Sequence, residues 1–145
     1  PGHFYSIDAT KRGDITKTGL VWHNDEIQRS MSTAAIHGDI LYTADLGGIF
    51  YALDLSSGKT LWTHDLLAAV WSSPMFVDGK IYMGDEDGDV VVFQAGRTKK
   101  LLIETNMDNS IYTTPVAANG VLYITNRRMI FAIAEGASSN PKEIN

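Results

Sequence analysis

A repeat of about 40 residues runs through this sequence and constrains its fold more than any other feature. It is seen most simply in three tyrosines, Tyr42, Tyr82 and Tyr123, which follow one another at spacings of 40 and 41 residues. Each tyrosine closes a short apolar segment that is preceded by a glycine-containing turn sequence. Sequences with a period of about 20–50 residues form stacks of one supersecondary unit, because a single unit cannot bury its apolar faces alone.

The second unit shows the order of segments within one repeat. It begins with Trp71-Ser72-Ser73-Pro74-Met75-Phe76 and continues with Asp78-Gly79-Lys80-Ile81-Tyr82. An acidic turn, Asp85-Glu86-Asp87-Gly88, and the apolar segment Val90-Val91-Val92-Phe93 follow. Short apolar segments separated by turns roughly every 8–12 residues indicate strands, and Asp-Gly or Asn-Gly between two of them indicates a tight hairpin.

We therefore predict an all-β chain. Four short strands in about 40 residues are typical of one propeller blade, so the predicted fold is a β-propeller of four-stranded antiparallel blades. About three blades are covered, as part of a larger ring, because the chain begins with the last two strands of one blade and ends with three strands of another. The predicted partial propeller spans residues 1–134 and is followed by a tail or linker at 135–145, with blade parts at 1–25, 30–66, 70–107 and 111–134.

Apolar residues that recur at equivalent positions of the repeat form the predicted core. Burial at such positions is expected because each blade must pack on its neighbours. The predicted core residues are Ile40, Tyr42, Leu53, Ile81, Tyr82, Phe93, Leu122, Tyr123 and Ile133.

Charge and composition narrow the classes of partner. The net charge of −5, from 12 Lys plus Arg against 17 Asp plus Glu, argues against a nucleic-acid partner, which requires a basic surface. The sequence has no cysteine, which excludes disulfides and thiolate metal sites. No apolar run approaches the roughly 18 residues of a membrane span. We expect a protein partner, or the rest of the same propeller, and no membrane-spanning segment.

Several of the repeated segments resemble the quinoprotein (pyrroloquinoline-quinone-type) β-propeller repeat family. The resemblance rests on Ser72-Ser73-Pro74, Asp78-Gly79-Lys80-Ile81-Tyr82, Tyr51-Ala52-Leu53-Asp54 and Ser57-Gly58-Lys59-Thr60-Leu61-Trp62, and it covers roughly residues 4 to 134. The second unit departs from the pattern, because it ends in Gly96-Arg97-Thr98-Lys99-Lys100-Leu101 without the tryptophan. The family resemblance implies a bacterial protein of the periplasm or cell envelope, similar to outer-membrane assembly propellers or to quinoprotein dehydrogenases.

The resemblance also suggests where a cofactor would lie. The quinone-dependent enzymes of the family stack a tryptophan on pyrroloquinoline quinone, and Trp71, at the start of an innermost strand, is the candidate for that role. The alternative is that Trp71 packs one blade on the next, as Met31 and Tyr112 would at the same repeat position. The family's calcium ligands and catalytic aspartate cannot be matched to any residue of this sequence, so we identify no catalytic residue.

One acidic turn is a candidate metal site. Asp85, Asp87 and Asp89 alternate around Gly88, and Ca²⁺ prefers several oxygen ligands of this kind. The full calcium-loop pattern is absent, and a solvated hairpin turn explains the same residues. The sequence therefore favours a non-catalytic scaffold without a cofactor. The alternative is a fragment of a pyrroloquinoline-quinone-dependent alcohol or sugar dehydrogenase, with calcium.

Overall fold

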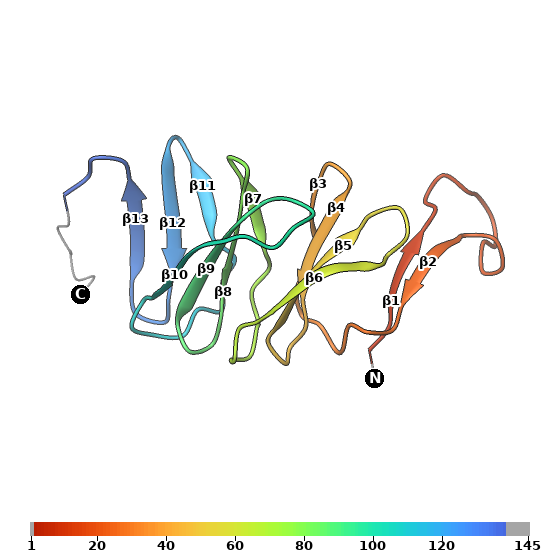
Figure 1. Ribbon diagram of the computed structural model, residues 1–145, viewed down its shortest axis with the longest axis horizontal. Coiled ribbons are helices and arrows are strands. Elements are labelled where there is room, and N and C mark those ends of the chain that lie inside the picture. Colours follow the sequence, from red (N-terminus) through yellow and green to blue (C-terminus); the bar gives the residue numbers. More distant parts are fainter. Residues whose placement is uncertain (1, 139–145) are drawn as a thin grey trace.

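The fold consists of antiparallel sheets that stand side by side along an arc, as a computed structural model shows for residues 2–138 (Figure 1). Residues 139–145, most of the predicted tail, lie outside the described part of the chain. Residues 2–138 contain thirteen strands, and no helix among them is long and apolar enough to cross a membrane.

Two sheets are complete four-stranded blades, each running from an inner to an outer strand. The first blade contains β3 (Ala35–His37), β4 (Ile40–Ala44), β5 (Ile49–Asp54) and β6 (Thr60–Asp65). The second blade contains β7 (Met75–Val77), β8 (Lys80–Gly84), β9 (Asp89–Gln94) and β10 (Leu101–Asn106). The predicted four-stranded antiparallel blade is thereby confirmed.

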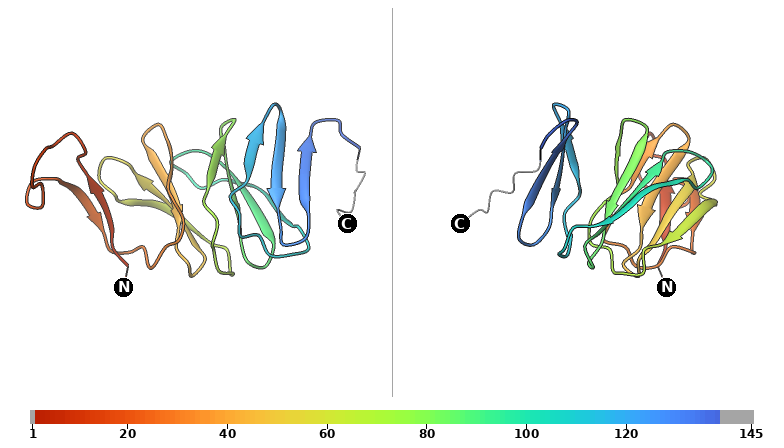
Figure 2. Two further views of the ribbon diagram at one scale, coloured as in Figure 1. Left: turned by 180° about the vertical axis from the view of Figure 1, so that it is seen from behind. Right: turned by 60° about the vertical axis from the view of Figure 1, so that its left-hand side comes forward.

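The two remaining sheets are parts of blades, as the sequence predicted. An opening pair is formed by β1 (Phe4–Ile7) and β2 (Leu20–Asn24). The third blade is formed by β11 (Val116–Ala118), β12 (Val121–Thr125) and β13 (Ile130–Ala134). Figure 2 shows the four sheets in chain order from one end of the arc to the other.

The molecule has two faces, which differ in the kind of connection between strands that each one carries. We call the face with the β3–β4, β7–β8 and β11–β12 turns the hairpin face; it lies along the upper edge of Figure 1. Gly38, Asp78 and Asn119 have positive φ angles of 58°, 48° and 52° at these turns, which explains why Gly, Asp and Asn recur there. The opposite face carries the loops that join one blade to the next, and we call it the loop face.

Main-chain hydrogen bonds fix the loop face. The amide of Leu46 donates to the carbonyl of Arg29 over 2.7 Å. The amide of Glu86 donates in the same way to the carbonyl of Ala69 over 2.9 Å. In the third blade, the amide of Arg127 donates to the carbonyl of Ser110 over 3.1 Å. Each blade is therefore held to the loop that delivers the chain from the preceding blade.

The core lies between the blades. Of the predicted core residues, five are buried, namely Ile40, Tyr42, Leu53, Ile81 and Phe93. Tyr82 and Leu122 are half-buried. The prediction was wrong for Tyr123 and Ile133, which are 38% and 46% exposed. Tyr123 occupies the position from which Tyr42 reaches the next blade, and no further blade follows within residues 2–138. Ile133 lies beside an incompletely filled space between the second and third blades.

Candidate functional site

The loops of the loop face begin with a repeated polar cap. Each outer strand ends in a side chain that accepts a hydrogen bond from the amide two residues later, a turn for which Asp and Asn are favoured. Asp65 accepts from the Leu67 amide over 2.9 Å, and Asn106 accepts from the Asp108 amide over 2.8 Å. Asn24 makes the same bond with Glu26 over 2.9 Å. The second residue after each cap is thereby placed at the tip of a loop.

Leu67 is the exceptional residue at this loop-tip position. The neighbouring repeats place the charged residues Glu26 and Asp108 there, whereas Leu67 exposes 86% of its surface to solvent. Its φ angle is 62°, a left-handed conformation that costs a branched side chain free energy and favours glycine. An apolar side chain held outward in this conformation is not explained by packing.

Trp71 lies close to Leu67 in sequence, on the loop before β7 and not within an innermost strand as predicted. Its ring meets that of Tyr112 edge to face, with ring centres 6.3 Å apart. Glu86 binds both rings, because its carboxylate accepts from the Trp71 indole and from the Tyr112 hydroxyl, each over 3.1 Å. Trp71 therefore contacts the third blade through Tyr112 while it remains exposed.

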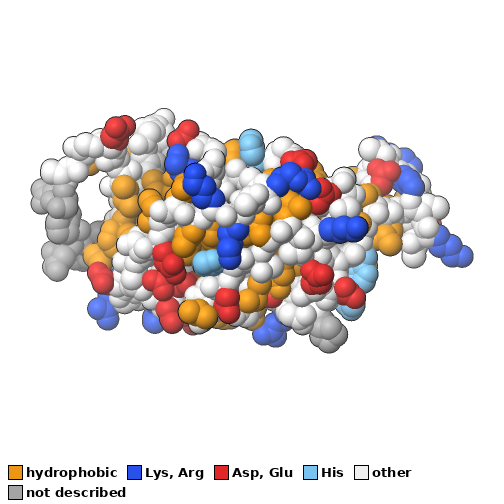
Figure 3. Space-filling view, viewed as in Figure 1, with side chains coloured by type: hydrophobic (Ala, Val, Ile, Leu, Met, Phe, Trp, Pro, Cys, Tyr) orange, Lys and Arg blue, Asp and Glu red, His pale blue; other side chains and the backbone are white. Residues whose placement is uncertain are grey.

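Exposed apolar side chains lie on these loops beside charged residues of both signs. We call Met31, Leu67, Trp71 and Tyr112 the loop-face patch, and all four are exposed. The adjoining loops and turns carry Glu26, Glu86 and Asp108 together with Arg29, Arg127 and Arg128. In Figure 3, acidic, basic and hydrophobic side chains lie next to one another along the lower edge, where the loop face is seen.

The three aspartates of the acidic turn lie in different environments. Asp85 is buried, and one of its carboxylate oxygens accepts from the Asp87 and Asp89 amides over 3.0 and 2.9 Å. Its other oxygen has no hydrogen-bond partner. Burial raises the pKa of Asp85, and the hydrogen bonds from the turn oppose that rise. The Asp87 side chain is exposed, and that of Asp89 accepts from Asn106 over 2.8 Å.

The arrangement of the acidic turn does not fit a calcium site. One Asp85 oxygen closes the turn by binding backbone amides, as Asp45 does in the first blade with the Ile49 amide over 3.1 Å. Within residues 2–138, no three His, Cys, Asp or Glu side chains gather in a way that could hold a metal ion. Glu86 engages the N–H edge of the Trp71 indole and leaves the ring exposed.

Sequence reasoning singled out Trp71 but missed Leu67. The sequence does contain a signal for Leu67, because an alignment of the three loops shows charged residues, Glu26 and Asp108, at the equivalent positions. Its exposure could not be read from the sequence, since the stretch Leu66-Leu67-Ala68-Ala69-Val70 reads as apolar throughout, and Leu66 and Val70 are indeed buried.

Comparison with known proteins places this geometry in a family. The model of the outer membrane protein assembly factor BamB family matches residues 11–101. Outer membrane protein assembly factor BamB from Escherichia coli (strain K12) is 30% identical over 115 residues, which cover 77% of this chain and 28% of the relative. The 1-butanol dehydrogenase (cytochrome c) of Thauera butanivorans is 31% identical over 134 residues, covering 79% of this chain and 19% of the enzyme. The chain thus spans less than a third of the length of either relative.

Solved structures show the same fold. The crystal structure of BamB from Moraxella catarrhalis matches with a TM-score of 0.70 at 20% identity, covering 79% of this chain and 36% of that one. A quinohemoprotein alcohol dehydrogenase from Pseudomonas putida HK5 matches with a TM-score of 0.65 at 24% identity, covering 74% and 18%. The sheets are therefore blades of a β-propeller, as predicted.

Proposed function

Because this chain belongs to the outer membrane protein assembly factor BamB family, whose members are propellers of the quinoprotein-type repeat, we propose that it is a non-catalytic protein-binding scaffold. The observation that carries the proposal is Leu67, an 86% exposed leucine held at a φ angle of 62°. A strained and exposed apolar side chain is retained more readily when it contacts a partner than when it serves the fold.

The chemistry of the loop-face patch defines the partner. Trp71 and Tyr112 provide aromatic surface of the kind enriched at protein interfaces, and Glu86 holds both rings in place. The charged residues of both signs around them favour a partner segment that carries charges beside an apolar side chain. The name of the E. coli relative supports a place in the bacterial cell envelope.

A site-specific cross-link tests this proposal. A photo-reactive amino acid at Leu67, in full-length protein in bacterial cells, should give discrete cross-links to an envelope protein. The same amino acid at Ile36 is the matched control, because Ile36 is also apolar and exposed but lies on an inner strand away from the loop-face patch. Equal cross-linking from both positions, or none from Leu67, would contradict a docking role for the patch.

A second function, as part of a pyrroloquinoline-quinone-dependent alcohol dehydrogenase, is favoured by the 31% identity with the Thauera enzyme. The local hydrogen bonds of Asp85 and Asp89 speak against a calcium site in the acidic turn, and within residues 2–138 no three His, Cys, Asp or Glu side chains gather to hold a metal ion. We expect no quinone binding by these blades. Titration of the protein with quinone and Ca²⁺, followed by absorbance and calorimetry, measures this, and saturable micromolar binding would favour the enzyme.

A further inference from the structure

The two interfaces between successive blades are filled very differently. At the first interface, between the first and second blades, the Trp62 ring packs between Phe50 and Phe93, with ring centres 5.6 and 5.2 Å apart. His37 stacks on Phe76 with ring centres 3.9 Å apart. Aromatic rings from both blades thus fill this interface from the outer strand to the inner one.

At the second interface, between the second and third blades, a smaller residue stands at each corresponding position. One repeat further along the chain, Phe50 is replaced by Val90, Trp62 by Ile103 and Phe93 by Ile133. On the inner strands, the stacked pair of His37 and Phe76 is replaced by Val77 and Ala117. Every one of these exchanges removes an aromatic ring.

The polar bonds that Gly96 and Arg97 make at the first interface are missing from the second. Gly96 of the second blade donates its amide to the Tyr42 hydroxyl over 2.9 Å and accepts from the Trp62 indole over 3.0 Å. Arg97 binds Asp39 and Asp54 of the first blade over 2.5 and 2.8 Å.

At the second interface, the equivalents of the two acids are Gly79 and Gln94, so the ion pairs have no counterpart there. Tyr82, the equivalent of Tyr42, makes no hydroxyl hydrogen bond with any residue of the range 2–138. Its hydroxyl is therefore available to bind another molecule.

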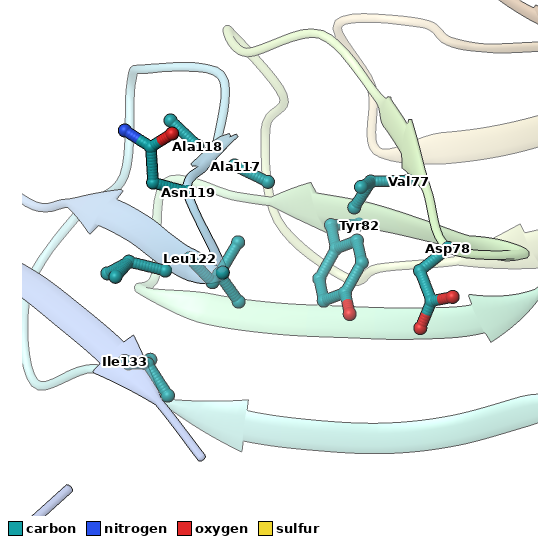
Figure 4. A pocket seen from close by; sticks show the side chains of 10 residues that line it. Val77, Asp78, Tyr82, Ala117, Ala118, Asn119, Leu122 and Ile133 are labelled. Atoms are coloured by element: carbon teal, nitrogen blue, oxygen red, sulfur yellow. The ribbon is translucent and has the colours of Figure 1, made fainter.

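A solvent-open cleft of about 410 Å³ lies between the blades, and three of the smaller residues, Val77, Ala117 and Ile133, line it. Figure 4 shows Tyr82 pointing into this space, with Ala117 and Leu122 on the facing blade and Asp78 at the edge. Asp78 belongs to the β7–β8 turn, so the cleft opens toward the hairpin face, opposite the loop-face patch.

We propose that this cleft binds a small, uncharged aromatic compound with one hydrogen-bonding substituent, of the phenol or indole class. The occupant is suggested by the first interface, where the rings of His37, Phe76 and Phe93 stand at the positions of Val77, Ala117 and Ile133. A volume of about 410 Å³ lies at the small end of ligand pockets, which suits one or two rings.

The polar groups of the cleft match the ligand's substituent. The Tyr82 ring offers a face for stacking, and its hydroxyl can donate to or accept from the ligand. The carboxylate of Asp78 lies at the rim, where it is paired with Lys80 over 2.8 Å, so the rim adds no net charge and suits an uncharged ligand. The apolar side chains of Val77, Ala117, Leu122 and Ile133 complete the lining.

Calorimetry and amide NMR on full-length protein, with indole and p-cresol as probes, test the proposal. We expect saturable binding of both probes, with shifts of the Tyr82, Ala117 and Leu122 amides, and little binding of cyclohexanol. Ala117→Phe, which restores the ring present as Phe76 at the first interface, should weaken binding at least about tenfold. Tyr82→Phe should weaken it about threefold to tenfold, the range for one neutral hydrogen bond.

A substitution at the first interface, where aromatic rings fill the equivalent space, provides the control. Phe76→Ala opens the equivalent space between the first and second blades, so we expect the cleft to keep its affinity and a second, weaker site to appear near His37. Absence of saturable binding by both probes would overturn the proposal. So would unchanged affinity in Ala117→Phe, or protection of the cleft amides in the free protein by other residues of the same chain or by a second copy.

Discussion

The indole nitrogen of Trp62 donates a hydrogen bond to the carbonyl of Gly96 in the next blade, over 3.0 Å. Trp22 makes the corresponding bond to the Leu55 carbonyl one blade earlier, over 2.8 Å. The third outer strand has Ile103 at this position, which has no N–H to donate. The interface between the second and third blades therefore lacks this hydrogen bond.

This difference predicts unequal costs for truncating two equivalent residues. Trp62→Ala should lower the free energy of unfolding by about 3–5 kcal/mol, because a buried ring and an interblade hydrogen bond are lost. Ile103→Ala should cost less than about 1 kcal/mol, since Ile103 is 54% exposed. Urea denaturation of both variants measures the difference, and equal losses would contradict the unequal filling of the two interfaces.

The unpaired oxygen of Asp85 predicts a pH-dependent effect of Asp85→Asn. The folded chain binds the Asp85 proton more tightly than the unfolded chain, because burial raises its pKa. Ionisation therefore opposes folding: the penalty is absent below the unfolded pKa of about 3.9 and complete above the folded one. Asp85→Asn should gain stability relative to the natural chain as the pH rises from about 3 to 7.

The equivalent residues of the other two blades support this test. Asn126 shows that an asparagine fits the position, and Asp45 provides a control variant. Asn126 occupies the Asp85 position in the third blade and donates to the Met107 carbonyl over 2.7 Å. Asp45 binds the Tyr51 hydroxyl over 2.8 Å, so Asp45→Asn should instead lose about 1–3 kcal/mol at pH 7. Thermal melts across the pH range measure both variants, and a pH-independent difference for Asp85→Asn would contradict the role of the buried carboxylate.

The left-handed backbone at Leu67 predicts opposite effects of glycine and valine. Leu67→Gly relieves backbone strain of about 1 kcal/mol, because glycine adopts the left-handed conformation freely. Glycine also raises the entropy of the unfolded chain, which offsets part of this gain, so the free energy of unfolding should stay equal or rise slightly. Leu67→Val should lose about 1 kcal/mol, because a β-branched side chain fits this conformation poorly. Calorimetric melting temperatures give the order, and a valine variant more stable than the glycine variant would contradict it.

The exposed acid of the turn predicts no calcium response. Asp87→Asn should change the free energy of unfolding by less than about 0.5 kcal/mol, as at exposed positions generally. Melting temperature should also be insensitive to added Ca²⁺. A calcium-dependent rise that Asp87→Asn abolishes would reinstate the metal interpretation of Asp85, Asp87 and Asp89.

The two end sheets predict the behaviour of residues 1–145 expressed alone. Apolar side chains are exposed on both end sheets, including Tyr5 and Val21 on the opening pair and Val116 and Ile130 on the third blade. Such surfaces favour association. We expect oligomers or aggregates in sedimentation velocity and weak amide protection in the third blade. A cooperative, fully protected monomer would contradict this expectation.

The repeat made most of the fold predictable. Spacing identified the strands, and the turn residues identified the hairpins, because both depend on local conformation. Burial was predicted correctly where a neighbouring blade supplies matching volume, as for Tyr42 and Phe93. It failed for Ile133, because the repeat indicates which positions face a neighbour but not whether the neighbour fills the space.

The candidate sites were less predictable for the same physical reason. The acidic turn has the same residue types whether its first carboxylate is solvated or buried, and only the packing of the blades places Asp85 inside. Leu67 lies in an apolar run in which Leu66 is buried, so its outward direction depends on the turn that Asp65 closes.

In each blade, the turn between the second and third strands is tied to the preceding loop by a main-chain hydrogen bond, from Leu46 to Arg29, Glu86 to Ala69 and Arg127 to Ser110. The side chain at the loop tip takes no part in these bonds and can be exchanged without breaking them. Glu26, Leu67 and Asp108 illustrate this freedom, since three different side chains occupy one loop position. A propeller of this kind can acquire new binding specificity on its loop face through single mutations while its architecture is inherited unchanged.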